Sequence, residues 1–401
     1  MAMKNTTNTN YHGGDRLKAS RRTFLIGGTS TVGIAGLAGC LGADNDNGDD
    51  TGDGDDTVDP DSPPEEPDSL TVRAWGGVWQ ESFEENVAVP FTEETGIEIV
   101  WDNTDAQTTR GEIRTAIDQD REPPVNVNWD LVTRTYQSYR EGLHEPLDED
   151  IVTNIDQMRD EARPDTGDEL MFVNLYPYTY ALCYNEDKLE DVQGDREPVE
   201  SWNPLWDEQY ENEHGIYNDP PGDGFFSVLA ELADVELGPA EEMEPVWDLV
   251  EDLSPNIGYL GTDASIAEAI REGEITYALG YLPNNLREAQ EDGEPVGWTI
   301  PEEGATVRMD SLSTPQNQSE SELYWAQQFI NTALDEDVQN NWMEHLQVPM
   351  LHQNVTPPDW MEDDPAFPTS DADFDDLLMM DMDVYAEYSP FWSERFTEIV
   401  G

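Results

Sequence analysis

The stretch LTVRAWGGVWQESF, residues 70–83, decides the fold class of this chain. Its first six residues predict a buried strand, which Gly76-Gly77 ends. Apolar residues at helical spacing then continue to Thr95, where Pro90 is expected to kink or shorten the helix, and IEIVW (residues 97–101) predicts a second strand. A strand, a helix and a strand in this order indicate a parallel sheet with helical crossover connections.

The same alternation of strands and helices continues along the chain. Further strands are predicted at residues 129–132, 171–184 and 275–281, and helices at residues 225–237, 244–253, 265–272, 320–334 and 336–346. A chain of 401 residues is too long for one ordinary hydrophobic core. We therefore expect an α/β fold of two lobes.

The charge of the chain is strongly one-sided, with 89 acidic and 19 basic residues and a net charge of −70. Nucleic acid is excluded as a partner, because its phosphates would be repelled. The 12 Trp, 15 Tyr and 11 Phe argue against disorder for most of the chain. Abundant acids with Lys188 as the single lysine after residue 40 resemble the composition of halophilic archaeal proteins. We expect the fold to need molar salt, which screens this repulsion.

The N-terminus has the layout of an export signal. A basic segment ends at Arg22, and an apolar run at residues 24–39 is too short to span a membrane comfortably. Arg21 and Arg22, within SRRTFL, resemble a twin-arginine motif. The run ends in LAGC, which resembles a lipobox with Cys40 as the lipidated residue. Residues 1–40 therefore predict export by the twin-arginine pathway and a lipid anchor on the extracellular face of the cell membrane.

Residues 41–68 are rich in Asp, Gly and Pro and contain almost nothing to bury. They predict an acidic, disordered tether between the anchor and the folded body. Asp49, Asp53 and Gly54 lie at calcium-loop spacing, but Pro60 occupies the position of the closing Glu. We therefore predict no metal site there.

Nine segments of the folded body, in the same order along the chain, resemble the spermidine/putrescine-binding family of ABC importer receptors. They cover nearly all of residues 69–355. The segments are LTVRAWGGVWQESF, PFTEETGIEI, WDLV, GLHEPLD, YPYTYALCYNEDKL, ESWNPLWDEQY, AIREGEITYALGY, PVGWTIPEEGATVRMDSLSTP and AQQFINTALDEDVQNNWMEHL.

This resemblance implies a two-lobed periplasmic-binding-protein fold of type II, with mixed sheets flanked by helices. It implies hinge crossings near Tyr178, Tyr281 and Asp310, a first lobe of residues 69–177 plus 281–309, and a second lobe of residues 178–280 plus 310–401. The implied function is to capture a small organic cation, such as putrescine or spermidine, and to deliver it to a permease and its ATPase.

The first candidate site is the segment from Trp75 to Trp79, because ligands of open α/β sheets bind beyond the carboxyl ends of strands. Gly76 and Gly77 let backbone approach a ligand, and Trp75 and Trp79 offer faces for an ammonium. The helix that starts here would attract a carboxylate. The polyamine receptors have an acidic residue where Gly77 stands, so an amino acid or other zwitterion such as 4-aminobutyrate remains an alternative ligand.

The resemblance also implies site residues in three later segments. Asp223 and Asp310 are expected to hold the ligand amine, and Tyr281 to supply an aromatic face. Tyr176 and Tyr180 alternate along one strand and are expected on the same wall, unless they are an ordinary half-buried strand face. Asp223 equally fits the N-cap of the helix that follows it.

The sequence offers no catalytic set. The five histidines form no zinc-type pair, and no G-x-S-x-G segment or Cys-His pair is present. Cys183 is expected to be a buried free thiol. We therefore predict a receptor without metal or cofactor; a secreted hydrolase is the alternative class, for which no nucleophile and base can be named.

Cys40→Ser should release the protein into the medium, because the lipid is the hydrophobic attachment that the sequence predicts. Fractionation of cells and medium followed by immunoblotting measures this. A Cys40→Ser protein that stays with the membrane fraction contradicts the lipobox interpretation.

Overall fold

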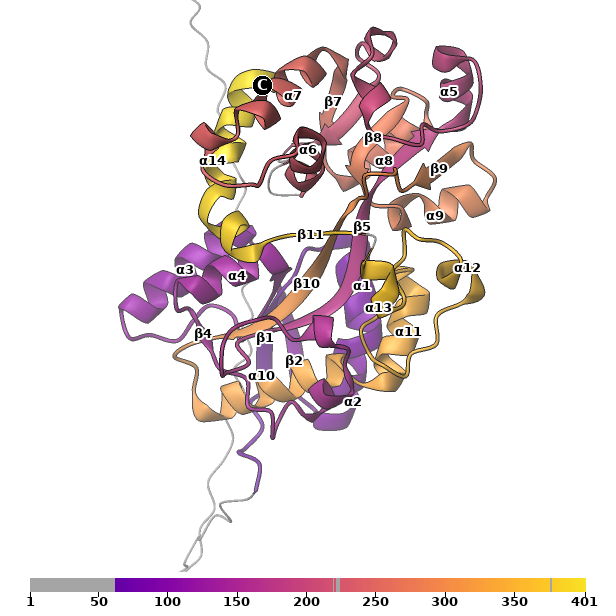
Figure 1. The fold of residues 1–401 in the computed structure, drawn as a ribbon. Helices are drawn as coiled ribbons and strands as arrows, with labels where there is room; N and C mark the ends of the chain where they lie inside the picture. The colour runs from indigo at the N-terminus through magenta and orange to yellow at the C-terminus, as the bar shows by residue number, and fades with distance from the viewer. Residues whose placement is uncertain (1–61, 219, 221–223, 376) are drawn as a thin grey trace, which may run out of the picture. The chain divides into compact units, whose positions relative to one another are not determined.

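The computed structural model describes residues 62–218, 220, 224–375 and 377–401, whose fold is shown in Figure 1. The predictions for Arg21, Arg22, Cys40 and Asp223, and most of the tether, lie outside these residues. None of the helices in this part of the chain has the length and apolar character needed to cross a membrane.

The strands and helices alternate as the sequence predicts. The strands are β1 (Ser69–Arg73), β2 (Glu98–Asp102), β3 (Val127–Leu131), β4 (His144–Glu145), β5 (Val173–Asn185), β6 (His214–Tyr217), β7 (Ile257–Gly261), β8 (Tyr277–Tyr281), β9 (Val296–Thr299), β10 (Thr306–Pro315) and β11 (Leu378–Met379). The main helices are α1 (Gly77–Phe83), α2 (Val89–Thr95), α3 (Ala106–Asp118), α4 (Val132–Arg140), α5 (Glu186–Gln193), α6 (Phe225–Ala233), α7 (Glu244–Leu253), α8 (Asp263–Arg271), α9 (Asn284–Glu291), α10 (Glu320–Ala333), α11 (Glu336–Leu346), α12 (Asp359–Glu362), α13 (Asp371–Phe374) and α14 (Met382–Val400).

The helix after the Gly-Gly turn passes through Pro90 instead of ending there. A π-helical turn, Glu84–Ala88, joins α1 to α2, and the N–H of Val89 bonds to the carbonyl of Glu84. Proline has no N–H and its ring crowds the preceding turn of an α-helix. The wider π turn accommodates this, and Gly96 ends the helix in the left-handed conformation.

The strands form one mixed sheet in the order β2-β1-β3-β10-β5-β8-β6-β7. β1 is parallel to β2 and β3, and β6 is parallel to β7 and β8, as the crossover pattern predicts. β5 and β10 are antiparallel and lie between these two groups. We call the group containing β1–β4 the first lobe and the group containing β6–β9 the second lobe (Figure 1). The expected α/β fold with two lobes is confirmed.

β5 and β10 are the strands that cross between the lobes. Residues 173–180 of β5 pair with β10, which also pairs with β3, and residues 181–185 pair with β8 and β9. Crossings near Tyr178 and Asp310 are therefore present. Tyr281, in contrast, ends β8, and the chain continues into α9 within the second lobe.

The division of residues between the lobes differs from the expected one in two segments. Residues 281–309 contain α9 and β9, and β9 pairs with the last part of β5 in the second lobe. α10 and α11 pack against β1 and α1 of the first lobe, although they lie within residues 310–401. The reason is that the chain returns to the first lobe through β10 and not at Tyr281, and that it reaches the second lobe again only after α11.

The first lobe encloses a cluster of large aromatic side chains. The indole of Trp342 on α11 is fully buried and stacks on Phe83 of α1, with 4.9 Å between the ring centroids and 7° between the planes. It also packs nearly perpendicular to the ring of Tyr176, with 5.1 Å between the ring centroids. α11 is therefore an integral part of this core.

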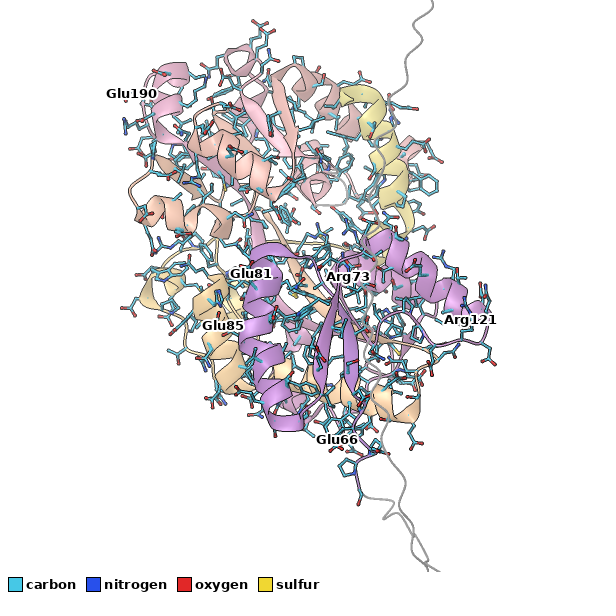
Figure 2. All side chains as sticks on the ribbon, turned by 180° about the vertical axis from the view of Figure 1, so that it is seen from behind. Glu66, Arg73, Glu81, Glu85, Arg121 and Glu190 are labelled. Atoms are coloured by element: carbon cyan, nitrogen blue, oxygen red, sulfur yellow. The ribbon has the colours of Figure 1, made fainter. Side chains whose placement is uncertain are left out.

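Acidic side chains lie mainly on the outside. In Figure 2, Glu81, Glu85 and Glu190 extend away from their helices, whereas Arg73 lies among the strands. The side chain of Glu85 is 75% exposed and that of Arg73 is 3% exposed. A solvated acidic surface is what the composition predicts.

Trp342→Ala should lower the free energy of unfolding by about 3–5 kcal/mol, because it leaves a large void beside Phe83. Denaturant unfolding in molar salt measures this, with Phe391→Ala as the control, since Phe391 is 59% exposed. Equal effects of the two substitutions would contradict the placement of α11 in the first-lobe core.

Candidate ligand-binding site

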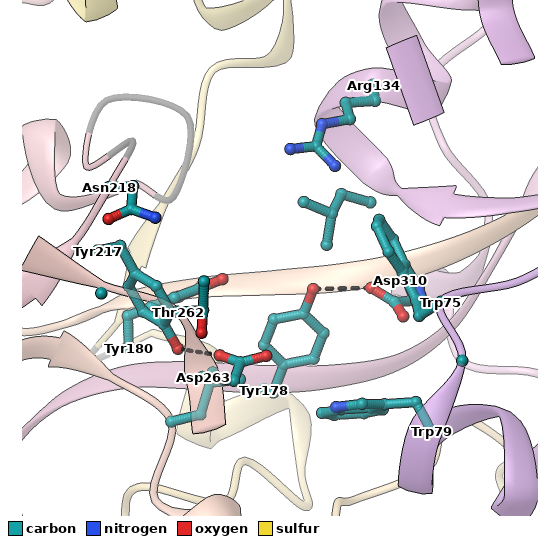
Figure 3. A pocket seen from close by; sticks show the side chains of 14 residues that line it. Trp75, Trp79, Arg134, Tyr178, Tyr180, Tyr217, Asn218, Thr262, Asp263 and Asp310 are labelled. Carbon is teal, nitrogen blue, oxygen red and sulfur yellow. Dashed lines mark hydrogen bonds between the residues drawn. The ribbon is translucent and has the colours of Figure 1, made fainter. Parts of the chain in front are cut away.

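A cavity of about 540 Å³ lies where the crossing strands meet strand ends of both lobes. Figure 3 shows it from close by. The first lobe contributes the loop after β1 and the start of α4, and the second lobe contributes the ends of β6 and β7. Tyr178, Tyr180 and Asp310 of the crossing strands form its floor. This is the place beyond the carboxyl ends of parallel strands where the site was predicted.

Two tryptophans and a glycine form the first-lobe wall. Trp75 and Gly76 follow β1, and Trp79 lies in the first turns of α1. Gly76 has a φ of 81°, a conformation that glycine adopts at little cost. The ring of Trp79 stacks on Tyr176 with 6.1 Å between centroids and 18° between planes. These rings give the cavity apolar faces that suit methylene groups or an ammonium.

Asp310 is a buried carboxylate in the floor, with 3% of its surface exposed. Tyr178 donates a hydrogen bond to its Oδ1 at 2.7 Å, and Tyr176 donates to its Oδ2 at 2.9 Å. The two tyrosines are two residues apart on β5, so both side chains face Asp310 on the neighbouring strand. Burial raises the pKa of Asp310 to about 6, and the tyrosine hydrogen bonds act against this rise. The carboxylate is ionised at neutral pH.

A second carboxylate, Asp263, lies at the start of α8 in the second-lobe wall. Tyr217 donates a hydrogen bond to its Oδ1 at 2.5 Å, drawn dashed in Figure 3. Burial raises the pKa of Asp263, and the hydrogen bond from Tyr217 opposes this. The cavity therefore has carboxylates on its floor and on its second-lobe side.

Tyr281 supports this wall instead of lining it. Its ring is fully buried and stacks on Tyr217, with 5.6 Å between centroids. Its hydroxyl donates to the backbone oxygen of Asp263 at 2.5 Å. The aromatic face that the sequence assigns to Tyr281 is presented to the cavity by Tyr217.

A group of three charged side chains lies next to Trp75 and consists of Arg73, Asp130 and Arg134. Asp130 is buried, and its Oδ1 is 3.7 Å from Nη1 of Arg73 and 3.8 Å from Nη1 of Arg134. The guanidinium of Arg73 lies over the Trp75 ring at 3.9 Å from its centroid. Burial lowers the pKa of Arg73 and raises that of Asp130, and each partner opposes the other's shift. Arg134 is the member of this group that lines the cavity.

The structure brings most of the predicted site together. Trp75, Gly76, Trp79 and Asp310 line one cavity, and Tyr180 joins them there. Gly77, with a φ of 59°, is exposed and does not line it. Asp223 is outside the described residues and stays a prediction.

Sequence reasoning did not identify Arg134, Asp263 or Tyr217. A signal existed for Arg134, since it is one of few basic residues and follows the predicted strand at residues 129–132. Asp263 is hidden among 89 acidic residues. Within the described residues, no group of three or more His, Cys, Asp or Glu side chains is arranged to hold a metal ion.

Curated proteins similar to this chain bind polyamines. It is 26% identical over 303 residues to the putrescine-binding periplasmic protein PotF of Escherichia coli, and the match covers 70% of this chain and 78% of that protein. It is also 26% identical over 281 residues to a spermidine/putrescine-binding periplasmic protein of Salmonella typhimurium, covering 68% of this chain and 75% of the relative.

Solved structures share the fold. The spermidine/putrescine ABC transporter substrate-binding protein PotD of Streptococcus pneumoniae matches with a TM-score of 0.63 at 18% identity, over 83% of this chain and 97% of that one. The Atu4243-GABA receptor matches with a TM-score of 0.67 at 17% identity, over 83% of this chain and 98% of that one. The family model described as bacterial extracellular solute-binding protein matches residues 86–369. This chain therefore belongs to the bacterial extracellular solute-binding protein family, whose members serve ABC transporters.

Proposed function

We propose that this protein captures a small organic amine in the cavity between its lobes and delivers it to the permease of an ABC importer. The observation that carries the proposal is the buried carboxylate of Asp310, which lies among Trp75, Trp79 and Tyr178. An ammonium is the group that such a site suits, since it offers a counter-charge together with aromatic faces. The proposed role is transport, as in the family, and not catalysis.

The position of Asp310 also fits a protein that closes on its ligand. Asp310 lies on a strand that pairs with β3 of the first lobe and with β5, which continues into the second. Asp263 faces the same cavity from the second lobe. An amine bound at the floor is therefore within the space that both lobes enclose, and domain closure around ligands is a known mode of such folds.

Two ligand classes fit this proposal. The curated relatives favour a polyamine such as putrescine or spermidine, whose amines would use Asp310, Asp263 and, as the sequence predicts, Asp223. An amino acid or other zwitterion such as 4-aminobutyrate is favoured by a specific observation, the cationic side chain of Arg134 in the same cavity.

We also propose the cellular setting that the N-terminal sequence predicts. Export by the twin-arginine pathway through Arg21 and Arg22, a lipid on Cys40 and an acidic tether would hold the receptor near its permease. The acidic composition supports an origin in a halophilic archaeon, where molar salt screens the surface charge.

Asp310→Asn should weaken the binding of a small amine more than tenfold, because removal of one partner from a buried charge pair costs about 2–5 kcal/mol. A thermal melt of the empty variant checks that it is folded, because the amide fills the same space but replaces one of the two hydrogen-bond acceptors by a donor. Calorimetric titration in molar salt with putrescine, spermidine and 4-aminobutyrate measures the affinity. Glu242→Gln is the control, because Glu242 is exposed and does not line the cavity. Failure of all these amines to bind the wild type would refute the proposed function.

Amine binding should weaken about tenfold between pH 7 and pH 5. The pKa of Asp310 is raised to about 6 by burial, so the empty site is ionised above pH 6 and loses its charge below it. The expected sign is therefore tighter binding as the pH rises. Titrations at pH 5, 6 and 7.5 measure this, and Asp310→Asn should remove most of the dependence. A pH-independent affinity in the wild type would show that Asp310 is not the amine's counter-charge.

A further inference from the structure

Arg134 is the one cationic side chain among the described residues that line the cavity. It extends from the first turn of α4, and its guanidinium points into the cavity on the opposite side from Asp263 and Trp79 in Figure 3. Its side chain is 32% exposed, so a ligand can reach it. In a chain with 89 acidic and 19 basic residues, a cation in the ligand cavity is an unusual placement.

The donors of Arg134 are largely unused within the described part of the chain. Its pairing with Asp130, at 3.8 Å, is longer than a hydrogen bond. Arg73 pairs with the same carboxylate oxygen and in addition donates to the carbonyl of Trp129 at 2.7 Å. Two guanidinium groups therefore share one carboxylate, which leaves a net positive charge in this group of three. A guanidinium with free donors binds a carboxylate through two parallel hydrogen bonds.

The helix that carries Arg134 adds to the attraction for an anion. α4 spans nine residues, its N-cap Leu131 provides no side-chain hydrogen bond, and its first turn holds no acidic residue. A helix N-terminus is electropositive, so it adds to the net positive charge that two guanidinium groups leave around Asp130. Leu131 and Arg134 both line the cavity, which places this helix end at its edge.

We propose that Arg134 binds a carboxylate of the ligand while Asp310 binds its ammonium, so that the cavity takes an amino acid with separated charges rather than a diamine. This inference rests on the proposed function and names the ligand class for the same cavity. A volume of about 540 Å³ has room for a chain of a few carbons between the two groups. Trp75 lies next to Arg134, with 5.8 Å between the guanidinium carbon and the ring centroid, and offers an apolar face for that chain.

The test compares three ligands that share a four-carbon chain: 4-aminobutyrate, putrescine and butylamine. Calorimetric titrations in molar salt use the wild type, Arg134→Gln, Arg134→Lys and the control Arg114→Gln. Arg114 also lies on the first lobe, but its side chain is 46% exposed and pairs with Glu141 away from the cavity. Thermal melts of each empty variant show whether it is folded.

In the wild type, we expect 4-aminobutyrate to bind at least tenfold more tightly than putrescine or butylamine. Arg134→Gln should lower the affinity for 4-aminobutyrate at least tenfold and change that for butylamine less than threefold. The affinity of Arg134→Lys for 4-aminobutyrate should lie between those of the wild type and Arg134→Gln, because a lysine keeps the charge but loses the paired hydrogen bonds. Arg114→Gln should bind all three ligands as the wild type does.

Three results would overturn the inference. Tighter binding of putrescine than of 4-aminobutyrate would contradict the inference but would still agree with the proposed function as an amine receptor. An equal loss for butylamine and 4-aminobutyrate in a folded Arg134→Gln would show that Arg134 only supports Asp130 and Trp75. If none of the amines binds the wild type, both the inference and the proposed function fail. The wild-type ligand series decides the ligand class even if the Arg134 variants do not fold.

Discussion

The carboxylate of Asp310, held by two tyrosine hydroxyls inside the strand pair that joins both lobes, is the interaction on which the site depends. A buried carboxylate is costly unless hydrogen bonds compensate for its lost hydration. Here the compensation comes from Tyr176 and Tyr178 of β5, so it exists only while β5 and β10 keep their register. The register shifts directly after Asp310, between Asp310 and Ser311. The buried charge of the cavity therefore depends on the backbone pairing of the two strands that join the lobes.

The buried basic residues of this acidic chain are hydrogen-bonded to acceptors inside the fold. Arg73, Arg159 and Arg308 are buried, and each is an arginine, whose planar group can bond to several acceptors at once. Arg73 bonds to the Trp129 carbonyl and covers Trp75, and Arg308 donates to Thr133 and Tyr180. Surface ion pairs such as that of Arg196 add little, because water and salt screen them. The interior is therefore far less one-sided in charge than the surface.

Local patterns in the sequence predicted the elements and the aromatic wall, because periodicity and glycine placement act over a few residues. The helix at Glu244–Leu253 and the Trp75–Trp79 turn are examples. What could not be predicted depends on contacts between distant segments. The family resemblance predicts that Tyr281 faces the ligand, but the ring of Tyr217 stacks on Tyr281 and lines the cavity in its place. The division into lobes failed at residues 281–309, since nothing local shows that the chain stays in the second lobe after β8. Asp263 resembles any other surface acid in the sequence, and only the fold shows that it lines the same cavity as Asp310.

The C-terminal segment adds a further connection beside the two crossing strands. β11 pairs with Thr306 and Val307 of β10, Tyr136 of α4 donates to Asp383 at the start of α14, and Tyr385 and Ser227 share a hydrogen bond in the second lobe. An antiparallel ribbon alone can both bend and twist. β11 adds a third strand at the edge of this ribbon, and α14 contacts both lobes. We expect both elements to stiffen the ribbon against twisting. We expect the relative motion of the two lobes to be mainly bending, so that free energy gained at the cavity acts on a single rotational coordinate.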